Sequence, residues 1–129
     1  MKLVITGSRA IPAAGVEFAR AAVARAKTLG WEIIVGDAPG VDAVVIAEAN
    51  KLGVKVTVFG ANYKMRHRTK AGINWMGGLS YAKRDKHMAR LGDCCLAIWN
   101  GTSKGAKATV DYAQSIGKET WIKKFEGRS

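Results

Sequence analysis

Short apolar runs alternate along the chain with longer segments in which apolar residues recur every three or four positions. A short run rich in β-branched residues predicts a buried strand, whereas the second pattern predicts a helix with one apolar face. The runs predict strands at residues 2–6, 31–35, 54–59, 94–99 and 120–122. The helical pattern predicts helices at about residues 14–29, 41–52, 81–91 and 104–116.

This alternation of strands and helices is typical of an α/β protein. Strands that are apolar throughout indicate a parallel sheet, because helices then cover both of its faces. We therefore expect a Rossmann-like, three-layer α/β/α fold with a mostly parallel, five-stranded sheet. A chain of 129 residues can bury one core of this kind but not two, so residues 1–129 are expected to form a single domain.

Residues 60–80 are the exception, since they show no clear period. A connection of this length is uncommon in a compact domain and is usually functional or mobile. The segment combines basic residues with Tyr63 and Trp75, and Tyr81 follows directly. We predict a basic loop that contains aromatic residues.

The charge of the chain narrows the range of partners. There are 21 Lys and Arg residues against 10 Asp and Glu residues, which gives a net charge of +11. Residues 61–90 alone carry eight basic residues and one acidic residue, Asp85. A regional excess of this kind favours a polyanion, a nucleotide or an acidic surface as the partner. The alternative is a solvated basic face that serves solubility alone.

Composition disfavours several other classes of protein. No apolar run approaches the roughly 20 residues of a membrane span. The first strand begins at once, without a signal-peptide-like apolar region, so a cytoplasmic protein is expected. Cys94 and Cys95 are neighbours on a predicted strand and point to opposite faces, which suits two core residues better than a disulfide or a metal site. We expect neither a metal nor a resident cofactor.

Three predicted strands run directly into glycine-containing turns that begin a helix. The turns comprise residues 7–9, 36–42 and 100–105. Because the carboxyl ends of parallel strands share one edge of the sheet, the turns are expected to lie together there. Backbone amides and the positive ends of helices gather at such an edge and favour an anion, most often a phosphate.

The first turn, Gly7-Ser8-Arg9, offers a sharp bend, a hydroxyl group and a guanidinium group that suits two phosphate oxygens. The alternative is a plain turn in which Arg9 pairs with Asp37 or Asp42.

The second turn holds Gly36 and Gly40 together with two aspartates, Asp37 and Asp42. It matches neither a Walker loop nor the dinucleotide fingerprint. The aspartates are expected either to cap the helix that follows or to accept hydrogen bonds from a ribose or a base.

The third turn is the best phosphate-binding candidate. It combines Gly101 and Gly105 with the hydroxyl groups of Thr102 and Ser103, and Lys104 stands at the start of a helix. A cation is locally unfavourable at a helix N-terminus, which makes more sense if an anion binds nearby.

Arg84 and Asp85 lie near the start of the helix that precedes this last strand. Arg84 can reach back over the same edge of the sheet. The alternative is a surface ion pair, which contributes little to stability.

Three motifs in this order resemble the SLOG superfamily: Gly7-Ser8-Arg9, Gly36-Asp37-Ala38-Pro39-Gly40-Val41-Asp42, and the stretch from Lys83-Arg84-Asp85 to Thr109. The resemblance covers nearly the whole chain except residues 60–80. The superfamily includes the DNA-processing protein DprA (Smf), the Lonely-guy phosphoribohydrolases and small stand-alone proteins of the YspA type, which this chain resembles. The resemblance implies a Rossmann-like fold whose sheet edge binds nucleotides or related phosphorylated ligands, often in a homodimer or higher homo-oligomer.

The branches of the superfamily imply different activities. Lonely-guy enzymes remove ribose 5′-phosphate from a base with a glutamate at the place where this chain has Thr109. A hydroxyl group cannot replace that carboxylate, so the resemblance argues against an enzyme, although Asp37 and Asp42 remain conceivable bases. DprA has a threonine at the position of Thr109 and binds single-stranded DNA.

Three hypotheses follow. The first is binding of a nucleotide or nucleotide-derived phosphorylated ligand by Gly7, Ser8, Arg9, Gly36, Asp37, Gly40, Asp42, Arg84, Asp85, Gly101, Thr102, Ser103, Lys104, Gly105 and Thr109. The second is binding of single-stranded nucleic acid through the same edge, with stacking on Tyr63, Trp75 or Tyr81 and phosphate contacts from Lys64, Arg66, Arg68, Lys70, Lys83 and Lys86. The third is a nucleoside-monophosphate phosphoribohydrolase.

Overall fold

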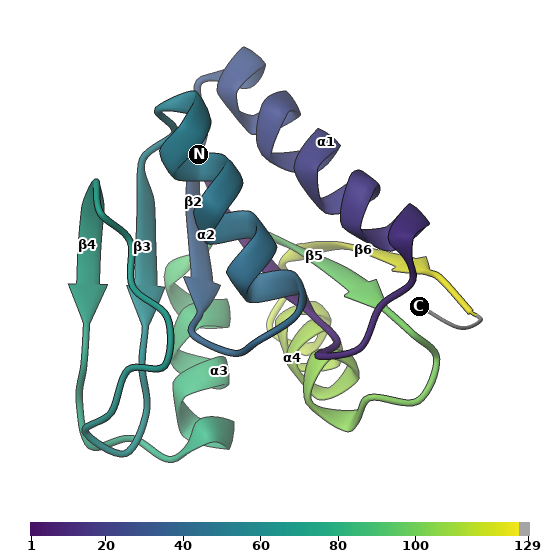
Figure 1. The fold of residues 1–129 in the computed structure, drawn as a ribbon. Coiled ribbons are helices and arrows are strands. Elements are labelled where there is room, and N and C mark those ends of the chain that lie inside the picture. Colours follow the sequence, from purple (N-terminus) through teal and green to yellow (C-terminus); the bar gives the residue numbers. More distant parts are fainter. Residues whose placement is uncertain (127–129) are drawn as a thin grey trace.

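A computed structural model describes residues 1–126 (Figure 1). One sheet contains the strands β1 (Lys2–Gly7), β2 (Glu32–Gly36), β3 (Val56–Phe59), β4 (Gly72–Trp75), β5 (Cys94–Trp99) and β6 (Glu119–Lys124). Four helices are present in the described residues: α1 (Ala13–Leu29), α2 (Val41–Leu52), α3 (Tyr81–Leu91) and α4 (Lys104–Ser115). The strand order is β4-β3-β2-β1-β5-β6, and every neighbouring pair is parallel.

The helices form layers on both faces of the sheet, as the apolar strands predict. In Figure 1, α1 and α2 lie in front of the sheet, and α3 and α4 lie behind it. Each face has its own buried cluster. Cys94 belongs to the cluster under α1 and α2, and Cys95 belongs to the one under α3 and α4. Both cysteines are therefore free core residues on opposite faces.

The predicted number of strands, five, is wrong by one. The additional strand is β4, which lies within residues 60–80 and pairs with β3 from Val56↔Gly72 to Phe59↔Trp75. All four of its residues are exposed, so the strand has no buried apolar face for the sequence to reveal. Its alternation is also too short to distinguish from a loop.

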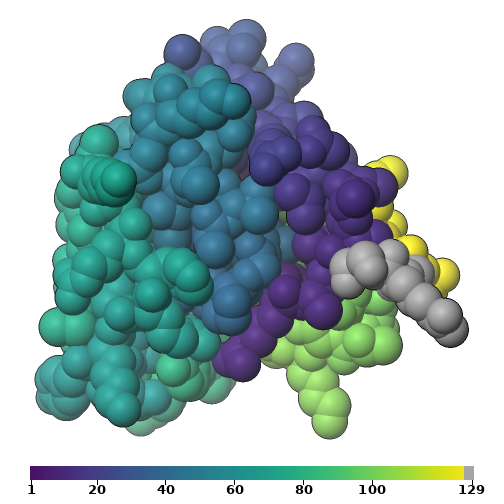
Figure 2. All heavy atoms as spheres, viewed as in Figure 1, coloured from purple at the N-terminus to yellow at the C-terminus, as the bar shows by residue number. Residues whose placement is uncertain are grey.

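The segment between β3 and β4 is held by specific hydrogen bonds. The side-chain oxygen of Asn50 accepts the amides of Lys70 and Ala71 at 3.0 Å each. The Asn74 side chain exchanges two hydrogen bonds with the backbone of Thr69. In Figure 2 the segment 60–80 forms one side of the molecule beside α2. Residues 60–71 therefore form an ordered crossover between two parallel strands.

None of the helices in residues 1–126 has both the length and the apolar composition required to cross a membrane.

Candidate functional site

The three glycine-containing turns meet at the carboxyl edge of the sheet. Backbone hydrogen bonds join them, since the Val41 amide donates to the Ser8 carbonyl at 3.2 Å and the Ser8 amide donates to the Ile98 carbonyl at 3.1 Å. Together with the starts of α3 and α4, the turns enclose a cavity of about 410 Å³, which we call the edge cavity. It is lined by Thr6, Gly7, Arg9, Ala10, Gly36, Ala38, Asp42, Arg66, Tyr81, Arg84, Asp85, Met88, Asn100, Ser103, Gly105 and Ala106.

The structure brings eight of the predicted ligand residues into this lining: Gly7, Arg9, Gly36, Asp42, Arg84, Asp85, Ser103 and Gly105. The other predicted ligand residues, which do not line it, are Ser8, Asp37, Gly40, Gly101, Thr102, Lys104 and Thr109. Three residues of this second group, Ser8, Asp37 and Thr109, are buried and make hydrogen bonds within the protein.

Ser8 and Asn100 fix the geometry of the turns. The buried Ser8 hydroxyl oxygen accepts the Asn100 amide at 3.0 Å. The side-chain oxygen of Asn100 accepts the amides of Thr102 and Ser103 at 3.0 and 2.9 Å. These two amides of the predicted phosphate-binding turn are therefore already occupied by a side chain.

Donors remain in the first turn of α4. The amides at the start of a helix have no partner within the helix, and two of the residues concerned, Gly105 and Ala106, line the edge cavity. Ser103, the N-cap residue, makes no side-chain capping hydrogen bond. Lys104 is exposed outside the lining. The N-terminus of α4 thus faces the cavity with its positive end.

Arg84 is the buried cation of the site. Its Nε donates to Asp85 at 2.7 Å, and its Nη1 donates to Asp37 at 3.0 Å and to the Phe59 carbonyl at 2.7 Å. The side chain is only 6% exposed, so the interpretation as a surface ion pair is wrong. Within residues 1–126, the Nη2 group of Arg84 has no hydrogen-bond partner.

Asp37 lies behind the cavity and anchors both arginines. Its carboxylate accepts the Arg66 amide at 2.7 Å, the Arg66 Nη2 at 2.8 Å and the Arg84 Nη1 at 3.0 Å. Burial opposes ionisation of this carboxyl, but the hydrogen bonds from the two arginines outweigh it and lower the pKa of Asp37. Asp37 is therefore ionised at neutral pH.

Asp42 differs sharply from Asp37. Burial raises its pKa to about 7, and the hydrogen bond from the Ala38 amide and the charge of Arg84 only partly oppose this shift. Burial also raises the pKa of Asp85, against the opposing effect of the Arg84 charge and its hydrogen bond. The carboxyl groups around the Arg84 guanidinium thus differ in proton affinity, since the pKa is lowered for Asp37 and raised for Asp42 and Asp85.

Two glycines make room for this arrangement. A Cβ atom on Gly36 would lie 2.8 Å from the Asp42 Oδ2 and 3.0 Å from the Arg84 Nη1. Gly40 has a φ of +86°, which disfavours other residues, and a Cβ there would overlap the Arg9 carbonyl. Both glycines of the second turn are therefore required by close packing around the site.

Arg9 lies at the mouth of the cavity and is exposed. It makes no ion pair among the described residues, so it does not take the alternative role of a partner to Asp37 or Asp42. Arg9 is thus a cation that remains available to a molecule in the cavity.

The residues predicted to contact nucleic acid occupy different environments. Arg66 lines the edge cavity, pairs with Asp37 and stacks over the Tyr81 ring at 4.6 Å. Its Nε is buried without a hydrogen-bond partner. The remaining cations are exposed: Lys64, Arg68 and Lys70 on the segment before β4, and Lys83 and Lys86 on α3.

The predicted stacking residues also differ in environment. Trp75 packs against Phe59 and His87 with ring centroids 5.3 and 5.5 Å away. Tyr63, by contrast, is 77% exposed.

Thr109 is buried, and its hydroxyl donates to the Gly105 carbonyl at 2.9 Å. It lies within hydrogen-bonding reach of Asp85.

Asn100 is the main site residue that sequence reasoning missed. Its place directly after a strand and before Gly101 was the available signal, since asparagine commonly closes turns of this type.

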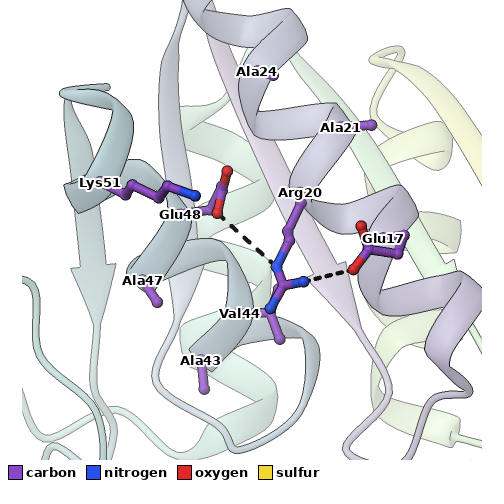
Figure 3. A pocket seen from close by; sticks show the side chains of 9 residues that line it. All are labelled: Glu17, Arg20, Ala21, Ala24, Ala43, Val44, Ala47, Glu48 and Lys51. Carbon is purple, nitrogen blue, oxygen red and sulfur yellow. Dashed lines mark hydrogen bonds and ion pairs between the residues drawn. The ribbon is translucent and has the colours of Figure 1, made fainter.

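A wider hollow of about 890 Å³ lies between α1 and α2 (Figure 3). Alanines from both helices and Val44 are among the residues that line it, and Arg20 points toward Glu17 and Glu48. Arg20 thus pairs with both glutamates, whereas Lys51, which also lines the hollow, makes no ion pair with any described residue. In residues 1–126, no group of three His, Cys, Asp or Glu residues is arranged to hold a metal ion.

No protein-family model and no curated protein matches this sequence. Solved structures do match its fold. The molybdenum cofactor carrier protein of Chlamydomonas reinhardtii is 18% identical, with a TM-score of 0.78 over 94% of this chain and 74% of that one. The molybdenum cofactor binding protein of the phototrophic bacterium Rippkaea orientalis is 16% identical, with a TM-score of 0.80 over 95% of this chain and 76% of that one.

DNA processing protein A of Helicobacter pylori, which binds single-stranded DNA, also matches. It is 15% identical with a TM-score of 0.73, and the match covers 95% of this chain but 64% of that one. These similarities concern the fold, and they confirm the fold expected from the sequence motifs. The chain has the Rossmann-like, three-layer α/β/α fold of these solved structures.

Proposed function

We propose that the protein binds a nucleotide or nucleotide-derived phosphorylated ligand in the edge cavity. Arg84 carries this proposal. Two carboxylates and a carbonyl hold its guanidinium group in place, and Nη2 is left over beside the cavity. A cation already fixed in position binds an anion with little further loss of side-chain entropy.

Two further features support an anion at this place. Arg9 lies at the mouth without a carboxylate partner in residues 1–126, and two residues of the first turn of α4, where amides have no partner within the helix, line the same cavity. Arg66 and Arg84, however, are largely neutralised by Asp37 and Asp85. The balance of charge therefore favours one phosphate group over a polyphosphate chain.

The dimensions of the cavity agree with such a ligand. Its volume of about 410 Å³ lies within the range of roughly 300–1,000 Å³ that is usual for small-molecule sites. Of the proteins of similar fold, one is named a carrier and another a binding protein of the molybdenum cofactor. That cofactor therefore belongs in the panel of candidate ligands.

Isothermal titration calorimetry with nucleoside monophosphates, inorganic phosphate and the molybdenum cofactor tests the proposal. We expect at least one phosphorylated compound to bind with a stoichiometry of one per chain. Arg9→Ala should weaken this binding about tenfold, because it removes a charge-assisted hydrogen bond.

Arg25→Ala is the matched control, since Arg25 is an exposed arginine on α1 outside the edge cavity. It should leave the affinity unchanged. The absence of binding by every compound, or equal losses in both variants, would contradict the proposal.

A second candidate function is the binding of single-stranded nucleic acid. The specific observation in its favour is the segment before β4, where Lys64, Arg68 and Lys70 are exposed and make no ion pair with any described residue. Tyr63, 77% exposed, offers a free ring for base stacking on the same segment.

Fluorescence anisotropy with a labelled single-stranded oligonucleotide at several salt concentrations tests this function. Replacement of Lys64, Arg68 and Lys70 by alanine should lower the slope of log affinity against log salt by about 2, since each phosphate contact on a single strand contributes about 0.7. Replacement of Arg25, Lys27 and Lys51 changes the net charge equally and serves as the control. Equal effects of the two sets would refute a specific nucleic-acid surface.

A further inference from the structure

Two carboxyl groups line the edge cavity, and among the described residues that of Asp85 is hydrogen-bonded to an arginine, whereas that of Asp42 is not. Asp42 stands in the first turn of α2, is 6% exposed and lines the cavity. Its Oδ2 accepts the Ala38 amide at 3.1 Å. Within residues 1–126, the second oxygen, Oδ1, has no hydrogen-bond partner.

Charged groups from three segments act on Asp42. Arg84 on α3 and Arg66 on the segment before β4 attract it, whereas Asp85 on α3 and Asp37 after β2 repel it. The Arg84 nitrogens that face Asp37 and Asp85 are already used in hydrogen bonds to those residues. An additional anion beside Asp42 would therefore add repulsion, and this side of the cavity favours a neutral group that donates hydrogen bonds.

We propose that Asp42 recognises the base of the ligand, and that this base presents two adjacent N–H donors, as guanine does. This inference rests on the proposed function, because it assigns a second part of the same ligand. An ionised carboxylate has two acceptor oxygens and no donor, and Oδ2 keeps one lone pair beside its hydrogen bond from the Ala38 amide. Two adjacent N–H groups match it, whereas the edge of adenine places an acceptor nitrogen beside the amino group and is mismatched.

The ionisation of Asp42 supports this assignment at slightly alkaline pH. Burial raises its pKa to about 7, so above that value the carboxylate form predominates. Below it the protonated carboxyl has one donor and one acceptor, which lowers the preference for two adjacent donors.

Calorimetric titration at pH 8 with four nucleoside monophosphates, of guanosine, inosine, adenosine and xanthosine, tests the inference. The guanosine compound should bind about tenfold tighter than the inosine compound, which lacks the amino group, and tighter still than the adenosine compound. Asp42→Asn should weaken the guanosine compound about tenfold. The same substitution should raise the affinity for the xanthosine compound relative to the guanosine compound. Xanthine has a carbonyl group in place of the amino group of guanine, and the new asparagine amide can donate a hydrogen bond to that carbonyl.

Asp111→Asn, at an exposed position on α4 where the carboxylate pairs with Lys107, is the matched control and should not change the order of affinities. Thermal unfolding shows whether Asp42→Asn is folded. If all four compounds bind equally and Arg9→Ala weakens them all, the inference about Asp42 is wrong and the proposed function stands. If none of the four binds and no other phosphorylated compound does, both are wrong.

Discussion

Replacement of Asp42 by asparagine is expected to stabilise the protein at neutral pH more than at acidic pH. In the native protein burial raises the pKa of Asp42 to about 7, compared with 3.8 for an unperturbed aspartate. Asparagine keeps an oxygen that can accept the Ala38 amide and carries no titrating proton. The substitution therefore removes the cost of a buried ionising group while it keeps the local hydrogen bond.

The pKa difference sets the sign and the size of the effect. Between pH 3.8 and about 7 the native protein holds a proton that the unfolded chain has released. The free energy of unfolding of the wild type therefore falls as pH rises through this window. Each pH unit corresponds to about 1.4 kcal/mol. From pH 5 to pH 7, Asp42→Asn should gain up to about 3 kcal/mol relative to the wild type.

Urea denaturation at pH 5, 6, 7 and 8 measures this difference for the wild type, Asp42→Asn and the control Asp111→Asn. A pH-independent cost of the new amide group cancels, because the comparison concerns the change with pH. The control should show no such gain, since Asp111 is an exposed partner of Lys107. A constant difference between the wild type and Asp42→Asn from pH 5 to pH 8 would refute the reasoning.

Three further predictions concern other groups of the fold. Asp37→Asn should lower the free energy of unfolding at pH 7 by about 3 kcal/mol in urea denaturation, because it leaves the buried Arg84 without one of its carboxylate partners. That loss should shrink as pH falls from 3.8 through the lowered pKa of Asp37, since the stabilisation requires the ionised form. Gly36→Ala should cost about 1–3 kcal/mol by the same assay, because its methyl group overlaps the Arg84 and Asp42 side chains, whereas Gly105→Ala meets open space and should not destabilise. Cys95, whose pKa burial raises to about 12, should react with an aromatic disulfide reagent only after unfolding; rapid labelling of the native protein would contradict its position in the core.

The positions of most secondary-structure elements could be predicted because their patterns are local. The apolar runs at residues 2–6 and 94–99 correspond to β1 and β5. Both strands are buried on both faces, so they need apolar residues throughout, and those residues form the pattern that predicts them. The strand β4 could not be found in this way. It lies at an exposed edge of the sheet, where pairing with β3 replaces apolar burial as the cause of the strand.

The meeting of the three turns was also predictable, because parallel strands place their carboxyl ends at one edge. The connections made there by side chains were not. Asp37 pairs with Arg66, 29 residues away, and with Arg84, 47 residues away. No spacing in the sequence encodes those contacts. The same holds for Asn100, whose side-chain oxygen accepts the amides of Thr102 and Ser103 within the turn that was expected to bind a phosphate.

The sequence by itself determined the layers of the fold and the edge at which the site lies, since both depend on local apolar pattern and on glycines after strands. The tertiary structure alone decided which charged groups remain available there. Arg66 and Arg84 are held by Asp37 and Asp85, whereas Arg9 is free of ion pairs within residues 1–126. Asp42 is buried in a cavity where its proton is retained to about pH 7. The physical reason is that the ionisation and pairing of a side chain depend on burial and on neighbours from distant parts of the chain.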